Sequence, residues 1–90
     1  MGRETRSNVY AAIDGELAYQ RDLFGENPHE IDALATYIRR YSKVLDEAAT
    51  KSDSDTAKLE IVRKIAAIAV RCLEQHGAPL RAASAMKEEL

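Results

Sequence analysis

Several residue types are scarce in this 90-residue sequence, and their scarcity excludes whole classes of protein. It contains one cysteine, two histidines, no tryptophan, four tyrosines and one phenylalanine. With Cys72 as the only cysteine, the chain has no disulfide framework, and because Cys72 lies on an apolar stripe we expect a buried, structural thiol. His29 and His76 lie far apart, without cysteine or histidine neighbours at the spacing of zinc ligands. We therefore expect no zinc site.

Charge of one sign and long apolar runs are also missing. The net charge of −2 argues against a dedicated nucleic-acid-binding protein, which would be basic. Charged residues interrupt the start of the chain, so no signal peptide is expected. The most apolar segment, 57–76, is too short to span a membrane and carries Arg63, Lys64 and Arg71 among its residues. We expect a cytoplasmic protein without membrane contact.

Helical patterns occur in three segments, about 8–23, 28–50 and 56–76, and no strand pattern is present. Ser7 or Asn8 is the expected N-cap of the first helix, Asn27 followed by Pro28 that of the second, and Asp55 that of the third. Gly77 and Pro79 mark the end of the third helix. The expected core stripe of the second helix comprises Ile31, Leu34, Ala35, Ile38, Ser42, Leu45 and Ala49, widened by Tyr37, Tyr41, Val44 and Ala48.

The third segment is apolar on two faces, whereas an ordinary surface helix has one apolar stripe. A chain of this length buries only about 60–65% of its unfolded surface, so subunit association is the expected way to cover a second stripe. One stripe comprises Leu59, Val62, Ala66, Ala69 and Leu73, and the other comprises Ile61, Ile65, Ile68 and Cys72. The narrow polar strip that remains is a candidate place for a ligand and carries Glu60, Lys64, Arg71 and Gln75, with Arg63 at its edge.

These patterns predict an all-α fold, in which the second and third helices form a hairpin, the first packs across it, and subunits multimerise into a helical bundle. Residues 1–90 are expected to form one domain with its core in about 8–77. Residues 78–90 are expected to be either a short terminal helix or a mobile tail.

Several residues then suggest a family. The sequence contains Glu16-x-x-Tyr19-Gln20-x-Asp22 before a glycine turn, then His29, a tyrosine-containing helix and a segment from Arg63-Lys64 through Cys-Leu-Glu-Gln-His-Gly-Ala-Pro to Arg81. This arrangement, over about residues 9–81, resembles small phage-encoded MazG-like proteins, which are similar to the all-α nucleoside triphosphate pyrophosphohydrolases.

The resemblance implies two carboxylate pairs that hold Mg²⁺, because this cation prefers oxygen ligands. By pattern, the first pair falls near positions 39–43, where this chain has Arg39, Arg40 and Lys43. The second pair would begin at Glu60, but Arg63 occupies its partner position. Glu60 is therefore the one remaining candidate metal ligand, and we expect no catalytic residues. A magnesium cofactor is expected only if the chain is a hydrolase with relocated ligands.

The basic replacements favour binding of an anionic nucleotide without a metal, since guanidinium and ammonium groups bind phosphate oxygens directly. Tyrosine rings on the second helix could stack on a base. The alternative is that the basic residues form only a solvated face, paired with Asp46 and Glu47. For His29 and His76, roles at helix ends compete with ligand contact. The candidate ligand-binding residues are Arg39, Arg40, Lys43, Arg63, Lys64, Tyr37, Tyr41, Glu16, Tyr19, Gln20 and His76.

Three functions remain open at the level of sequence. The first is a homo-oligomeric, non-catalytic nucleotide-binding protein of phage type that sequesters a signalling nucleotide of host immunity. The second is a magnesium-dependent nucleotide pyrophosphohydrolase that uses Glu16, Glu60 and Glu74. The third is a protein–protein inhibitor or adaptor module.

Overall fold

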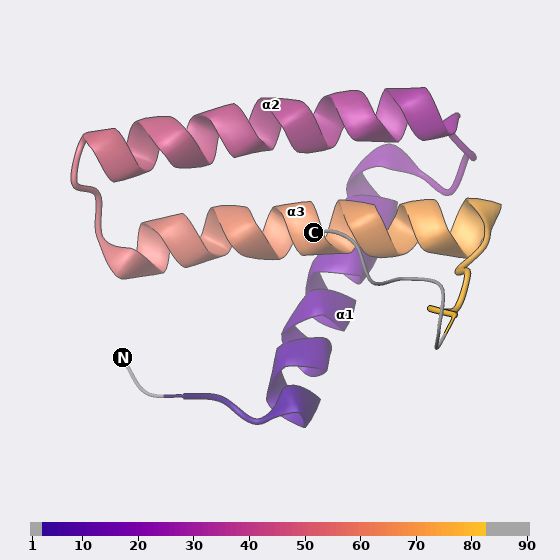
Figure 1. Ribbon diagram of the computed structural model, residues 1–90, viewed down its shortest axis with the longest axis horizontal. Coiled ribbons are helices and arrows are strands. Elements are labelled where there is room, and N and C mark those ends of the chain that lie inside the picture. Colours follow the sequence, from indigo (N-terminus) through magenta and orange to yellow (C-terminus); the bar gives the residue numbers. More distant parts are fainter. Residues whose placement is uncertain (1–2, 83–90) are drawn as a thin grey trace.

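The computed structural model describes residues 3–82 and is built from three helices, α1 (Arg6–Phe24), α2 (Ile31–Thr50) and α3 (Asp55–His76). Figure 1 shows α2 and α3 as an antiparallel hairpin, with α1 crossing α3 steeply. Helix α3 packs against both other helices. The prediction of an all-α fold, with a helical hairpin and an N-terminal helix across it, is confirmed for the described residues.

The helix starts differ from the predicted ones. The N-cap of α1 is Thr5, whose hydroxyl accepts a hydrogen bond from the backbone N–H of Asn8 at 3.1 Å, so the prediction of Ser7 or Asn8 was wrong. Likewise Ser54, which accepts from the N–H of Ala57 at 3.1 Å, caps α3 in place of Asp55. In both cases a hydroxyl residue just before the predicted cap satisfies an N–H of the first turn.

Helix α2 begins later than the sequence suggested. Its N-cap is Glu30, which makes no side-chain cap hydrogen bond, and Asn27 and Pro28 lie outside the helix. The backbone N–H of His29 is bonded instead to the side-chain oxygen of Gln75 at 3.0 Å. This tertiary contact holds the segment before α2 against α3.

The end of α3 lies where it was predicted. Gly77 has a φ of +120°, a region that residues with a Cβ rarely adopt, and its N–H bonds the carbonyl of Leu73 at 2.8 Å. Gly25 ends α1 in the same way, with a φ of +80°. Residues 77–82 are not helical, and 83–90, the rest of the predicted terminal helix or tail, lie outside the described residues.

The buried face of α2 is rotated from the predicted stripe. Leu34 is 1% exposed and Ala48 5% exposed, and Ile38, Tyr41 and Leu45 are half-buried. Four members of the predicted stripe are exposed in the single chain, namely Ile31, Ala35, Ser42 and Ala49. The core of the hairpin is completed by Ala67 and Ile68 of α3, and Leu17 of α1 is also buried.

Only one of the two apolar stripes of α3 is covered within the chain. The stripe that contains Ile68 is buried or half-buried, and Cys72 on it is half-buried rather than buried as predicted. On the other stripe, Leu59, Val62 and Leu73 are 49%, 43% and 48% exposed. Multimerisation through that stripe stays a prediction. In the described part of the chain, no helix has the length and apolar character that a membrane crossing needs.

Candidate functional site

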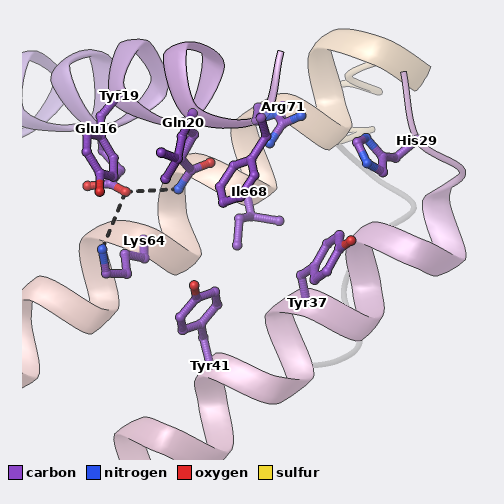
Figure 2. A pocket seen from close by; sticks show the side chains of 11 residues that line it. Glu16, Tyr19, Gln20, His29, Tyr37, Tyr41, Lys64, Ile68 and Arg71 are labelled. Atoms are coloured by element: carbon purple, nitrogen blue, oxygen red, sulfur yellow. Dashed lines mark hydrogen bonds and ion pairs between the residues drawn. The ribbon is translucent and has the colours of Figure 1, made fainter. Parts of the chain in front are cut away.

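A cavity of about 270 Å³ lies where α1 crosses the hairpin. Figure 2 shows its walls: the second half of α1, the segment before α2, the first half of α2 and the middle of α3. It is lined by Glu16, Tyr19, Gln20, Leu23, Phe24, His29, Tyr37, Tyr41, Lys64, Ile68 and Arg71.

At one end of the cavity, the carboxylate of Glu16 binds two basic residues of α3. Its Oε1 accepts from Arg63 Nε at 3.0 Å, and its Oε2 lies 3.8 Å from Lys64 Nζ. Burial by itself raises the pKa of Glu16, but hydrogen bonds from Gln20 and Arg63 and the charges of Lys64 and Arg63 outweigh this effect, so the pKa is lowered. Glu16 is therefore a paired, ionised carboxylate.

The same carboxylate fixes the orientation of Gln20. An ionised carboxylate can only accept, so the side-chain NH₂ of Gln20 points to Glu16, and Nε2 donates to Oε2 at 3.0 Å. The amide oxygen consequently points away from Glu16. It is buried and, within residues 3–82, has no hydrogen-bond partner. Gln20, itself only 6% exposed, thus presents an unsatisfied acceptor at the wall of the cavity.

Arg71 is the unusual residue of the site. It is 8% exposed and lines the cavity, yet the described residues provide no ion pair or hydrogen bond for its guanidinium. Figure 2 shows it between Gln20 and His29. Burial of an unpaired charge costs free energy. A guanidinium also carries five N–H donors, which can bond acceptor atoms of a ligand in the cavity. Arg71 is thus suited to an anion that enters the cavity.

Aromatic rings form much of the remaining wall. The rings of His29 and Tyr37 meet edge to face, with centroids 6.1 Å apart and planes at 75°. Lys64 Nζ lies 5.8 Å from the ring centroid of Tyr19. Tyr41 follows Tyr37 by one turn of α2, and Figure 2 shows it on the wall that α2 forms, across the cavity from α1. Such rings offer π-faces and edges against which a planar base can pack.

The last turn of α3 positions His29. Besides the bond from its N–H to Gln75, the carbonyl of His29 accepts from His76 Nε2 at 2.6 Å. The ring nitrogen Nδ1 of His29 is buried and, in the described part of the chain, has no partner. His29 thus adds a second unsatisfied polar atom to the wall near Arg71.

The structure brings six of the predicted site residues together at the cavity: Glu16, Tyr19, Gln20, Tyr37, Tyr41 and Lys64. Arg63 lies beside it, as a partner of Glu16, on the wall of a second depression between α1 and α3. His76 lies outside the cavity, and its Nε2 bonds the backbone carbonyl of His29, which is part of the cavity lining.

The basic residues of α2 do not line the cavity. Arg39, Arg40 and Lys43 are exposed, and Arg39 donates a hydrogen bond to Thr36 of its own helix, at 3.3 Å. The guanidinium of Arg40 lies 5.8 Å from the ring centroid of Tyr37, but Arg40 itself is not part of the cavity lining. Glu60 is exposed, and residues 3–82 contain no group of three or more His, Cys, Asp or Glu side chains that could hold a metal ion.

Sequence reasoning left Arg71 out of the predicted ligand-binding set, although a signal for it was present. Arg71 belongs to the polar strip of α3 that was considered a place for a ligand, one turn beyond the buried Ala67. Leu23, Phe24 and Ile68 were also left out, because apolar residues at helical spacing are indistinguishable from core residues in a sequence. His29 was considered, with a helix-end role as the alternative.

Comparisons with protein families, with curated proteins and with solved structures find no match to this chain.

Proposed function

We propose that the protein binds an anionic nucleotide in this cavity and holds it without hydrolysing it. The observation that carries the proposal is Arg71, a residue that is 8% exposed, lines the cavity and has no anionic partner among the described residues. A chain that keeps such a charge buried accepts a cost in stability, which an anion bound in front of it offsets.

The rest of the wall suits the other parts of a nucleotide. Tyr19, Tyr37, Tyr41 and His29 provide rings for a base, and Ile68 provides an apolar floor. Nucleotides combine a phosphate with a planar ring, which is the combination that these residues complement. The resemblance to MazG-like proteins supports the same class of ligand.

The chemistry of the lining favours binding over turnover. Among the described residues that line the cavity, Glu16 is the only carboxylate, and Gln20, Arg63 and Lys64 already engage its two oxygens. A metal-dependent hydrolase needs carboxylate oxygens that are available to the cation. Binding without turnover suits sequestration, and the resemblance to phage proteins favours a signalling nucleotide of host immunity as the ligand.

The test is an incubation of the purified protein with a nucleotide panel and Mg²⁺, followed by filtration, denaturation and chromatography of both fractions. The panel contains nucleoside mono-, di- and triphosphates, cyclic mono- and dinucleotides and cyclic ADP-ribose isomers. The expected result is one nucleotide that is retained intact and released on denaturation. Conversion to a monophosphate would show a hydrolase instead, and a panel that stays free and unchanged would favour a protein partner.

Two variants connect binding to the cavity. Arg71→Met removes the guanidinium of a residue that lines the cavity, whereas Arg39→Met removes one from an exposed residue of α2 and serves as the matched control. We expect Arg71→Met to weaken binding at least tenfold and Arg39→Met to leave it unchanged. The opposite ranking would move the site to the basic residues of α2.

A further inference from the structure

The charges around the cavity limit how many phosphate groups it can hold. We infer that the ligand is a nucleotide with a single phosphate group, that this phosphate lies on Arg71, and that a donor group of the same ligand bonds the amide oxygen of Gln20. The inference rests on the proposed function and narrows it to one class of nucleotide.

The first step concerns the available positive charge. Of residues 3–82, two with cationic side chains line the cavity, Lys64 and Arg71, and one with a carboxylate, Glu16. Lys64 Nζ lies 3.8 Å from Glu16 Oε2, so its charge is already largely compensated. Arg71 remains as the one lining cation without an anionic partner in the described residues. One guanidinium can bind two oxygens of one phosphate, whereas a triphosphate would enter with most of its charge unpaired.

The second step concerns distance along α3. Lys64 and Arg71 are two helical turns apart, which corresponds to about 10 Å along the axis. Figure 2 shows Ile68 between them. Lys64 pairs with Glu16 at one end of the cavity, and Arg71 lies beyond Ile68, so the two cations serve different parts of the cavity. The anionic end of the ligand therefore belongs at Arg71, and the ring of the base belongs over Ile68 and against the tyrosines.

The third step concerns size. The cavity volume of about 270 Å³ lies just below the usual range for ligand sites, about 300–1,000 Å³. A compact ligand with one phosphate fits this space better than one with a phosphate chain or a second nucleotide.

The fourth step concerns the unsatisfied acceptor. Gln20 is 6% exposed, and its amide oxygen is buried without a partner in residues 3–82. The NH₂ of Gln20 donates a hydrogen bond to Glu16, so a flip of the amide group would move this NH₂ away from the carboxylate and break the bond. A sugar hydroxyl or an exocyclic amine of the base would satisfy the oxygen, since both are hydrogen-bond donors.

The experiment is isothermal titration calorimetry of the full chain with matched ligands. The probes are the four ribonucleoside 5′-monophosphates, the four 3′,5′-cyclic monophosphates and the four 5′-triphosphates, each with and without Mg²⁺. We expect at least one ligand with a single phosphate to bind, and the triphosphate of the same base to bind at least tenfold more weakly. With Arg71→Met, the preferred ligand is expected to lose at least tenfold in affinity, and with Arg39→Met none.

Two further arms identify the donor for Gln20. A deoxy form of the preferred ligand lacks free sugar hydroxyls (2′,3′-dideoxy for a 5′-monophosphate, 2′-deoxy for a 3′,5′-cyclic monophosphate), and a form in which hydrogen replaces the exocyclic amine lacks that donor of the base. Loss of affinity of at least tenfold in one arm names the group, and unchanged affinity in both arms overturns the role of Gln20.

The outcomes separate the two proposals. If a triphosphate binds as tightly as the single-phosphate ligand of the same base, this inference fails while the proposed function stands. If no nucleotide of any phosphate number binds, both fail.

Discussion

Replacement of Arg71 by methionine should stabilise the ligand-free protein. Methionine is similar in length and can fill the same space, but it carries no charge to desolvate. The effective cost of burying an unpaired ion is several kcal/mol in real proteins. Because the Arg71 guanidinium faces a cavity, it is desolvated only in part and bears only part of that cost. We therefore expect Arg71→Met to raise the free energy of unfolding by about 1–2 kcal/mol.

Urea denaturation followed by circular dichroism measures this gain. With slopes of about 1–3 kcal/mol per molar urea for small proteins, the midpoint should rise by roughly 0.5–1 M. Protein concentration must be the same for both proteins, because association would shift the midpoint by mass action. The slope itself should not change.

The control is Arg63→Met, which removes a guanidinium that is paired. Arg63 Nε donates to the buried carboxylate of Glu16 at 3.0 Å, so its loss leaves a buried acceptor with fewer donors. We expect this variant to lose about 1–2 kcal/mol. Opposite signs for the two arginines would support the description of Arg71 as an unpaired buried charge. Destabilisation of Arg71→Met by 1 kcal/mol or more would refute it.

Three more predictions follow from the same contacts. The pKa of Glu16 is lowered from its ordinary value of 4.5, so its ionised form stabilises the fold above about pH 4.5, and this contribution is lost as the pH falls through the folded-state pKa. In thermal melts between pH 3 and pH 7, Glu16→Gln should have a lower melting temperature than the wild type at pH 7, and its melting temperature should fall less on acidification. Melting temperatures that fall in parallel for the two proteins would contradict this. Leu73→Glu places a charge on the exposed stripe of α3 and should convert an oligomer to a monomer, as measured by light scattering. Val9→Glu, on α1, is the control and should leave the oligomer intact. A monomeric wild-type protein would refute the predicted interface. Gln75→Ala removes the hydrogen bond to the N–H of His29 and should lower the free energy of unfolding by about 1 kcal/mol. It should also weaken nucleotide binding measured by calorimetry. Unchanged affinity would show that His29 takes no part in the site.

The fold class was predictable because local signals agreed along the whole chain. Apolar residues recur at helical spacing in three segments, and Gly77 stops α3 where the pattern ends. Helix starts were less predictable. Neighbouring hydroxyl and carboxylate residues, such as Ser54 and Asp55, can all cap a helix, and the backbone uses only one of them.

Part of the candidate site was also predictable, for a different reason. Glu16, Tyr19 and Gln20 were expected near a ligand from a family resemblance, and the structure places all three on the cavity wall. The basic residues of α2 were expected there too, but the rotation of α2 that buries Leu34 and Ala48 leaves Arg39 and Lys43 in solvent. A stripe as broad as that of α2 does not specify which of its edges faces α3.

The sequence by itself determined the three helices that residues 3–82 contain, where α3 ends, and that α3 has more apolar surface than one neighbour can cover. These properties depend on residues that are close in sequence, through helix periodicity and a glycine at positive φ. Only the tertiary structure decided that, within residues 3–82, the amide oxygen of Gln20 and the guanidinium of Arg71 would have no partner. The surroundings of a side chain depend on the angle at which α1 crosses α3 and on contacts between residues more than forty positions apart, such as Glu16 with Arg63, and no local pattern encodes them.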